Sequence, residues 1–446
     1  MSHDPLATPA PPAPSDPIRR GPAAFDYDVA IAGAGPAGVA TAVALVRRDP
    51  SLRGRVLLLD RAGFPRDKPC GGGLTGHAHE ALAALGLELV VPSFPSPRAE
   101  VRYGGLRREV RLGRPVRVIR REAFDASLVQ QARDLGVVVR EHTPLNGFTV
   151  EQGGVTLGLP AGAARARVLV GADGAGSQVR KHLVGHRQGP LRPAIRLFRA
   201  EVPARGRTAD AMLYDFTLMR EGLRGYLWIF PVPGDRLNVG LMHYPAGGRA
   251  AFSGAELVAL LRAGLAEHGI ALGDKDQDAG ALRGWPAWGY QPSTTVAAPH
   301  LLVVGDAAGI DALTGEGIAV GMEQGMVAAR AILAALTSGD FGFAGYRRAL
   351  RRATVGRELA LDRWLARMLY DGDDYRRWLA LVLLDAKMLE FYAARVSGTL
   401  VLADHKRYLM AALGRHLWHG RARYRQLEEA IAEAAPPTAL KSGVNG

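Results

Sequence analysis

Cysteine and long apolar runs are both scarce in this chain, and each scarcity excludes a class of protein. The single cysteine, Cys70, excludes an intrachain disulfide bond and a cysteine-rich metal site. The longest uninterrupted apolar run, Trp378–Leu384, is far shorter than the roughly 20 residues that a membrane-spanning helix needs. We therefore expect no transmembrane span and no metal centre.

Lysine is scarce as well, although the chain is strongly basic. It supplies 6 of the 56 basic residues, and the formal net charge is +13. The arginines are spread along the chain, and no helix-turn-helix, zinc-finger or RNA-binding motif accompanies them. We therefore expect no nucleic-acid partner. Attraction to anionic lipid or to an anionic cofactor is the second interpretation of the charge.

The two ends of the chain differ in composition from its body. Residues 1–24 are rich in Pro and Ala and lack the basic start and apolar core of a secretory signal. We interpret them as a disordered tail on a cytoplasmic protein and expect a second tail at 435–446. With 48% hydrophobic and 22% charged residues, the chain as a whole has enough apolar side chains for a core.

The first motif with chemical content is GAGPAG at 33–38, which follows a predicted strand at 27–32 and opens a predicted helix at 36–48. In such a loop Gly33 makes the tight turn, Gly35 lets a pyrophosphate approach, and Gly38 lets helix and strand pack closely. The helix N-terminus offers free N–H groups to phosphates. Asp60, at the end of the next predicted strand, would accept from ribose hydroxyls. This context favours a dinucleotide site over an ordinary glycine-rich loop.

Two later strands also deliver a carboxylate to a glycine-rich turn. Asp173 follows the strand 167–171, where a plain strand–turn–helix with Asp173 as N-cap is an equally good interpretation. Gly305-Asp306 follows the strand 301–305, and a long helix begins near Gly317. Asp306 would accept from ribityl hydroxyls, and the positive end of that helix would stabilise an anionic reduced flavin. One such motif could be a coincidence, but three in this order are a specific signal for a flavin nucleotide site.

With an R-x-x-F-D segment at 121–125, this layout resembles the FAD-dependent oxidoreductases of the p-hydroxybenzoate hydroxylase fold. Within that group the chain resembles the geranylgeranyl reductase family, through PCGGG at 69–73 and GYLWIFP at 225–231. The resemblance covers about residues 26–336. It departs from the family pattern at Gly176, where a charged residue is usual, and at Ala312, where proline is common.

The resemblance implies an α/β fold, α+β overall. It has a Rossmann-like FAD-binding domain, an inserted mixed or antiparallel β-sheet domain for the substrate, and a C-terminal helical region. We expect the FAD-binding domain at 25–185 and 299–340, the substrate domain at 186–298 with part of 91–118, and the helical region at 341–434. The strand-rich pattern of 186–298 and the helical pattern after Tyr346 agree with this division.

The resemblance also implies which residues contact FAD, with Leu145 expected at the end of the strand after Val139 as a backbone contact to adenine. The set is Gly33, Gly35, Ala37, Gly38, Asp60, Pro69, Gly71, Gly72, Arg121, Leu145, Asp173, Gly305, Asp306, Gly317 and Ile318. The departures at Gly176 and Ala312 bear on the fine geometry of the loops and on any nicotinamide docking beside Asp173.

Four further residues would carry the chemistry. The resemblance places Cys70 near the flavin ring, where it would give a proton to the substrate as flavin delivers hydride; the alternative is a small buried hydrophobic residue. Tyr226, Trp228 and Phe230 alternate on one predicted strand and share a face. They would wall a cavity for an isoprenoid chain, or form the ordinary core face of a sheet.

These features predict an FAD-dependent oxidoreductase that reduces carbon–carbon double bonds of a polyprenyl-like or other hydrophobic small molecule. The external electron donor would be NAD(P)H or ferredoxin. The alternative is a monooxygenase (hydroxylase) or halogenase of the same fold, acting through a flavin hydroperoxide. The Arg-rich helices after Tyr375 would cover the substrate pocket or rest peripherally on the inner face of a membrane, or they would simply form a packed cap.

Overall fold

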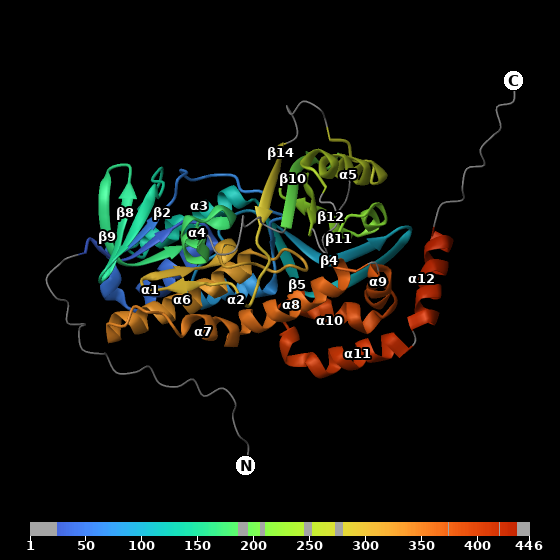
Figure 1. The fold of residues 1–446 in the computed structure, drawn as a ribbon. Helices are drawn as coiled ribbons and strands as arrows, with labels where there is room; N and C mark the ends of the chain where they lie inside the picture. Colours follow the sequence, from blue (N-terminus) through green and yellow to red (C-terminus); the bar gives the residue numbers. More distant parts are fainter. Residues whose placement is uncertain are drawn as a thin grey trace, which may run out of the picture.

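The computed structural model describes residues 25–185, 195–205, 210–244, 252–272, 280–372, 374–418 and 420–434. The tails expected at 1–24 and 435–446 lie outside these residues. The described chain forms two eight-stranded sheets beside one another, with helices beneath both of them (Figure 1). The predicted α/β fold with a Rossmann-like half is confirmed.

Sheet A is parallel at its centre. Strand β1 (Tyr27–Ala32) lies between β2 (Val56–Leu59) and β9 (Gly162–Gly171) and is parallel to both. All six residues of β1 are buried, as expected of a strand covered on both faces. Strand β6 (Val138–Arg140) lies beside β2, β16 (Leu301–Val303) lies beside β9, and β15 (Ala297–Ala298) lies beside β16. The hairpin β7 (Gly147–Glu151)–β8 (Gly154–Leu159) joins the sheet through β8, which pairs with β9.

This strand order brings the three sequence motifs together. Strands β1, β9 and β16 are neighbours and parallel, so their carboxyl ends meet at one edge of the sheet. The glycine-rich loop follows β1, Asp173 follows β9 and Asp306 follows β16. The crevice outside the carboxyl ends of such strands is where open α/β sheets bind ligands.

Helices α1 (Pro36–Arg48) and α6 (Ile318–Ser338) pack closely against each other beneath sheet A. A Cβ on Gly325 of α6 would lie 2.7 Å from the carbonyl oxygen of Ala37, so glycine permits this approach. Among the described residues, α6 is the one helix long and apolar enough to cross a membrane, and 67% of its most apolar stretch is buried inside the fold. Glu323 and Arg330 interrupt the apolar residues of α6, so no long uninterrupted apolar run marks this core helix in the sequence.

Sheet B forms the other half and is mostly antiparallel. Its order is β14 (Gly280–Ala287), β10 (Ile195–Pro203), β13 (Arg236–His243), β12 (Gly225–Val232), β11 (Ala211–Asp215), β4 (Ser93–Tyr103), β5 (Leu106–Ile119) and β3 (Gly73–Leu74). Helix α5 (Gly254–Glu267) covers one face through a separate apolar cluster that includes Leu227, Leu241 and Leu261. The opposite face is turned towards sheet A and the C-terminal helices.

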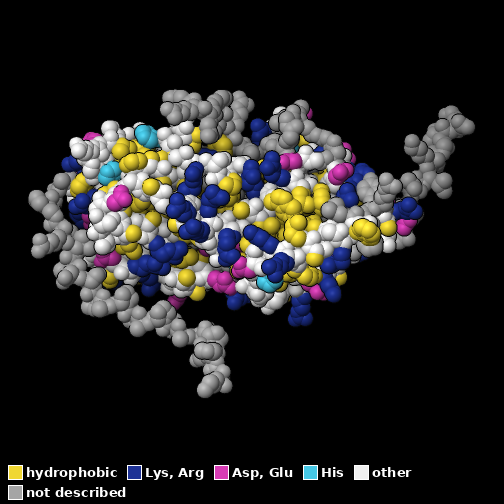
Figure 2. Space-filling model, turned by 60° about the horizontal axis from the view of Figure 1, so that its bottom comes forward, with side chains coloured by type: hydrophobic (Ala, Val, Ile, Leu, Met, Phe, Trp, Pro, Cys, Tyr) yellow, Lys and Arg dark blue, Asp and Glu magenta, His cyan; other side chains and the backbone are white. Residues whose placement is uncertain are grey.

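The C-terminal region is helical, as predicted. Its helices are α7 (Tyr346–Arg352), α8 (Thr354–Tyr370), α9 (Tyr375–Leu384), α10 (Ala386–Val396), α11 (Lys406–Trp418) and α12 (Gly420–Ala434). Elsewhere in the chain, helix α2 (Gly76–Leu85) packs against α6, and helix α3 (Arg121–Asp134) packs against α1. Figure 2 shows a face of the molecule with Lys and Arg side chains scattered among acidic and hydrophobic ones, not gathered into one stripe.

Candidate active site

One cavity of about 950 Å³ lies between sheet A, sheet B and helix α10. It is lined by every residue that the sequence singled out for cofactor, substrate or catalysis, with Gly38 as the exception. Gly38 instead packs behind the loop, where an added Cβ would lie 1.9 Å from the carbonyl oxygen of Gly33. Its position agrees with the packing role expected of the third glycine.

The glycine-rich loop presents a bare backbone to the cavity. Gly33 has φ +104°, and an added Cβ would lie 2.2 Å from the carbonyl oxygen of Ala172. A Cβ on Gly35 would meet only the tip of Arg66, at 3.7 Å. Helix α1 begins directly after Gly35, which carries no side-chain cap, so the first N–H groups of the helix are free for an anion.

Asp60 is held rigidly on the wall of the cavity. Its Oδ2 accepts the N–H of Ala34 at 3.0 Å, and its Oδ1 accepts the N–H of Ala62 at 2.9 Å. Arg66 lies 3.5 Å from the same carboxylate and also reaches Asp125, at 3.4 Å. Asp60 therefore keeps acceptor capacity in a fixed place beside the guanidinium group of Arg66.

Asp173 is not the N-cap of the α-helix that follows it, which was the alternative interpretation of this motif. Ser177 is the N-cap of α4 (Gln178–Val184), and Asp173 Oδ2 accepts the N–H of Gln178 at 2.8 Å. Its Oδ1 is buried and has no partner among the described residues, and burial raises the pKa of this carboxyl group. Leu145 lies in the loop beyond Arg140, the last residue of β6, and not at the end of a strand as expected. Its carbonyl oxygen already accepts from Gln178 Nε2 at 2.6 Å.

Asp306 meets a lysine that the motifs did not indicate. Lys68 Nζ lies 2.8 Å from Asp306 Oδ2. Burial alone would raise the pKa of Asp306, but Lys68 and Arg121 hold it below the ordinary value. Helix α6 begins at Ile318 with Gly317 as N-cap and no side-chain cap, so its positive end is open to the cavity.

Cys70 is half-buried in a loop that sheet B holds in place. Its carbonyl oxygen accepts from Asn238 Nδ2 at 2.8 Å, and Asn238 Oδ1 accepts from Trp228 Nε1 at 2.9 Å. The next turn requires glycine, because Gly72 has φ +77° and an added Cβ would lie 2.2 Å from the carbonyl oxygen of Ile119. The thiol therefore sits at a fixed point of the cavity wall.

Tyr226, Trp228 and Phe230 share one face of β12 and line the cavity, each less than 7% exposed. Tyr214 of β11 extends this aromatic wall, with its ring centre 5.5 Å from Tyr226 and 5.1 Å from Phe230. Trp285 also lines the cavity. The wall is apolar and wide, which suits a hydrophobic ligand.

The far end of the cavity comes from helix α10, which carries no sequence motif. Tyr392, Arg395 and Val396 line it there. Arg395 is buried and pairs with Glu358 at 2.8 Å and Asp362 at 2.5 Å, both on α8. The sequence indicated that these amphipathic helices could cover the pocket, but no motif indicated the individual residues, nor Lys68 and Asn238.

The residues present fit an FAD molecule. The glycine cradle with its uncapped helix end suits a pyrophosphate, the fixed carboxylate of Asp60 suits a ribose, and the uncapped end of α6 suits the electron-rich edge of a flavin. The orphaned oxygen of Asp173 leaves further acceptor capacity in the same cavity. A fold and cavity of this kind define a dinucleotide-binding flavoprotein.

Comparison with known proteins agrees with this class. Residues 26–345 match the family described as FAD binding domain. The chain belongs to this family of FAD-dependent oxidoreductases. A menaquinone reductase of Mycolicibacterium smegmatis is 31% identical over 68% of this chain and 75% of its own length. A digeranylgeranylglycerophospholipid reductase of Methanoculleus marisnigri is 30% identical over 50% of this chain and 55% of its own length.

Two solved structures share the fold. A geranylgeranyl bacteriochlorophyll reductase-like protein of Thermoplasma acidophilum aligns over 91% of this chain and 99% of its own, with a TM-score of 0.62 and 20% identity. A mutant of halogenase PltM in complex with FAD aligns over 92% of this chain and 93% of its own, with a TM-score of 0.61 and 16% identity. At these identities the likeness concerns the fold.

Proposed function

We propose that this protein uses reduced FAD to saturate carbon–carbon double bonds in a polyprenyl-like substrate. The observation that carries the proposal is that one cavity joins the dinucleotide motifs of sheet A to the aromatic wall of sheet B. The names of the relatives support an isoprenoid or quinone-like substrate. Bound reduced FAD supplies a hydride at its ring nitrogen N5.

The two halves of the chain have different proposed roles. In our proposal sheet A and its helices bind the cofactor, and the cavity face of sheet B with α10 binds the substrate. The proposed FAD contacts are Gly33, Gly35, Ala37, Asp60, Pro69, Gly71, Gly72, Arg121, Asp173, Gly305, Asp306, Gly317 and Ile318, with Gly38 supporting the loop from behind. Leu145 is a weaker member, because its carbonyl oxygen is already engaged.

Cys70 is the proposed proton donor. An alkene that accepts a hydride on one carbon needs a proton on the other, and a positioned acid speeds such transfers about 10²–10⁴-fold. The Cys70 thiol lines the cavity at the start of a glycine turn, next to the aromatic wall: an added Cβ on Gly71 would meet the Phe230 ring at 3.0 Å. Tyr226 is less suited, because its hydroxyl donates to the carbonyl oxygen of Thr314 at 2.5 Å.

An anaerobic reaction tests the proposal. The purified flavoprotein is reduced with dithionite and mixed with geranylgeranyl diphosphate or a geranylgeranylated lipid. We expect the flavin to reoxidise and the product to be heavier by two hydrogen atoms for each double bond. Cys70→Ala should retain flavin and slow this reaction by at least tenfold, with Cys70→Ser as the matched variant that keeps a weak proton donor. A flavin that stays reduced with every prenyl substrate would contradict the proposal.

The alternative function is oxygen-dependent hydroxylation or halogenation, which the halogenase fold supports. The same reduced protein separates the two, because the alternative predicts product only after oxygen is admitted. We further propose NAD(P)H or ferredoxin as electron donor and a cytoplasmic location with peripheral membrane contact. The exposed Trp364, Tyr408, Met410 and Trp418 on α8 and α11 support such contact.

A further inference from the structure

The cavity face of sheet B changes from apolar to basic along its strands. Leu197 of β10 lies directly opposite Trp285 of β14, and Arg199 lies opposite Arg283. Residues directly opposite each other on paired strands point to the same face of the sheet, and so do residues two positions apart on one strand. Since Leu197, Arg283 and Trp285 line the cavity, Arg199 faces it too. Two arginines therefore stand side by side next to the apolar wall.

Like charges directly opposite each other destabilise a pair of strands unless an anion lies between them. Asp67 takes that place, with oxygens 3.3 Å from Arg199 Nη1 and 3.5 Å from Arg283 Nη1. It comes from the loop that leads to Cys70, and its side chain is 24% exposed. The anion that separates the two guanidinium groups thus belongs to a partly exposed loop and not to the sheet.

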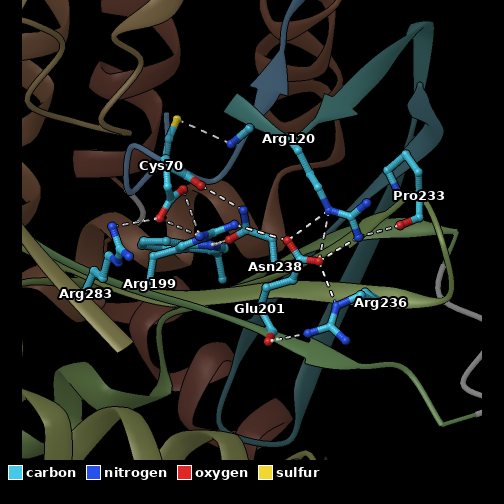
Figure 3. Close-up of polar contacts among 11 residues, drawn as sticks. Cys70, Arg120, Arg199, Glu201, Pro233, Arg236, Asn238 and Arg283 are labelled. Carbon is cyan, nitrogen blue, oxygen red and sulfur yellow. Dashed lines mark hydrogen bonds and ion pairs between the residues drawn. The ribbon is translucent and has the colours of Figure 1, made fainter. Parts of the chain in front are cut away.

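The neighbouring carboxylate, Glu201, is more than saturated with cations. It accepts from Arg120 at 2.6 Å, from Arg236 at 2.7 Å and from Arg199 at 3.2 Å. Figure 3 shows Arg120 and Arg236 converging on Glu201 at one end of this network, with Arg199, Arg283 and Cys70 at the other. In this network Arg120, Arg199 and Arg236 contact Glu201, and Arg199 and Arg283 contact Asp67.

Both arginines of the pair reach the cavity. Arg199 is 8% exposed, and its buried Nε has no partner among the described residues. Arg283 lies on the edge strand β14 and its side chain is 53% exposed, but it also lines the cavity and reaches Asp67. Lys68, which pairs with Asp306, adds a third cation, with Nζ 5.1 Å from the centre of the Trp285 ring.

We propose that Arg199, Arg283 and Lys68 bind a phosphate-bearing group of a molecule that enters the cavity. Guanidinium groups bind phosphate through paired, charge-assisted hydrogen bonds, and a partly dry setting strengthens them. The phosphate takes over the place of the Asp67 carboxylate between the arginines, and the partly exposed Asp67 side chain turns outward. The inference rests on the proposed function, because the group is the anionic end of either the prenyl substrate, as its diphosphate, or the pyridine nucleotide donor.

Binding of inorganic pyrophosphate to the FAD-loaded full chain, measured by titration calorimetry, tests this site without turnover. Arg283→Gln removes one charge from a side chain that is 53% exposed, so the fold is retained. We expect about tenfold weaker binding, the equivalent of one charge-assisted hydrogen bond. Arg283→Lys should lose less. The matched control is Arg107→Gln on β5, whose side chain is 63% exposed and pairs with Glu100 outside the cavity; its affinity should equal that of the parent.

Competition identifies the source of the phosphate. Displacement of pyrophosphate by geranylgeranyl diphosphate, but not by geranylgeraniol, assigns the site to the substrate, and displacement by NADPH assigns it to the donor. Absence of pyrophosphate binding, or equal affinity in Arg283→Gln and the parent, would overturn the inference. If the protein reduces alkenes but does not bind pyrophosphate, the proposed function holds and the phosphate site is refuted. If it binds pyrophosphate but reduces no alkene, the phosphate site holds and the proposed function is refuted.

Discussion

Replacing the buried Arg395, whose cation pairs with two carboxylates at the far wall of the cavity, should lower the stability of the protein. In Arg395→Met the side chain keeps much of its bulk, but Glu358 and Asp362 lose their common partner. These carboxyl groups are 9% and 1% exposed, and Asp362 Oδ1 already has no partner among the described residues. Breaking a buried ion pair by removing one partner costs about 3–5 kcal/mol, a large share of the roughly 5–15 kcal/mol that folded proteins have.

The loss of stability in Arg395→Met should depend on pH, and the structure determines the direction of this dependence. Burial raises the pKa of Asp362 well above its ordinary value, against the opposing effect of Arg395. Without Arg395 the folded-state pKa rises further above the unfolded one, so the folded chain holds more protons near neutral pH. The variant should therefore regain stability as pH falls, by at most about 1.4 kcal/mol per pH unit for one carboxyl group.

Chemical unfolding followed by circular dichroism between pH 5.5 and 8 measures both effects. The matched control is Arg357→Met on helix α8, next to Glu358, because Arg357 pairs with Asp404 where the two side chains are 38% and 50% exposed. That exposed pair should contribute no more than about 1 kcal/mol. Equal stability of Arg395→Met and the parent at pH 7.5, or a loss that does not change with pH, would refute the reasoning.

Three further predictions concern the loop, the wall and a buried histidine. Gly38→Ala places a Cβ 1.9 Å from the carbonyl oxygen of Gly33, so the protein should purify with little flavin; a normal ratio of flavin to protein absorbance would contradict this. Trp228→Ala should lower stability by about 3–5 kcal/mol in urea unfolding and raise KM for the prenyl substrate, because the side chain is 3% exposed on the cavity wall. Burial, with Arg196 and Arg224 nearby, lowers the pKa of His243 to about 4. The unfolded chain then takes the proton first, so stability should fall as pH drops below 6.5, and His243→Gln should flatten that slope.

The parts of the fold that the sequence predicted well depend on neighbouring residues. Strand Tyr27–Ala32 and helix Pro36–Arg48 match their predicted bounds, because an apolar run, a glycine loop and a proline at the helix start are all local signals. The position of Leu145 was predicted wrongly, because β6 ends at Arg140 and a loop follows. No local pattern sets the length of such an edge strand.

The missed parts of the site depend on contacts between distant segments. Lys68 and Asp306 are 238 positions apart, and Arg395 meets Glu358 across 37 positions. Each is an ordinary charged residue in its own segment, and its role follows only from the partner that the fold supplies. The motifs therefore indicated residues on both walls of the cavity, such as Asp306 and Tyr226, and the charged partners from distant segments required the structure.

The order of strands in sheet A has a consequence for how the protein is made. The glycine loop after β1 is synthesised early, but β16, the turn at Asp306 and helix α6 are synthesised only after every strand of sheet B. Until then the crevice has one side, and the stretch Leu169–Gly171 of β9 lacks its outer neighbour. The cofactor site is therefore complete only when β16 and α6 have joined sheet A, so flavin should bind late in the maturation of the protein.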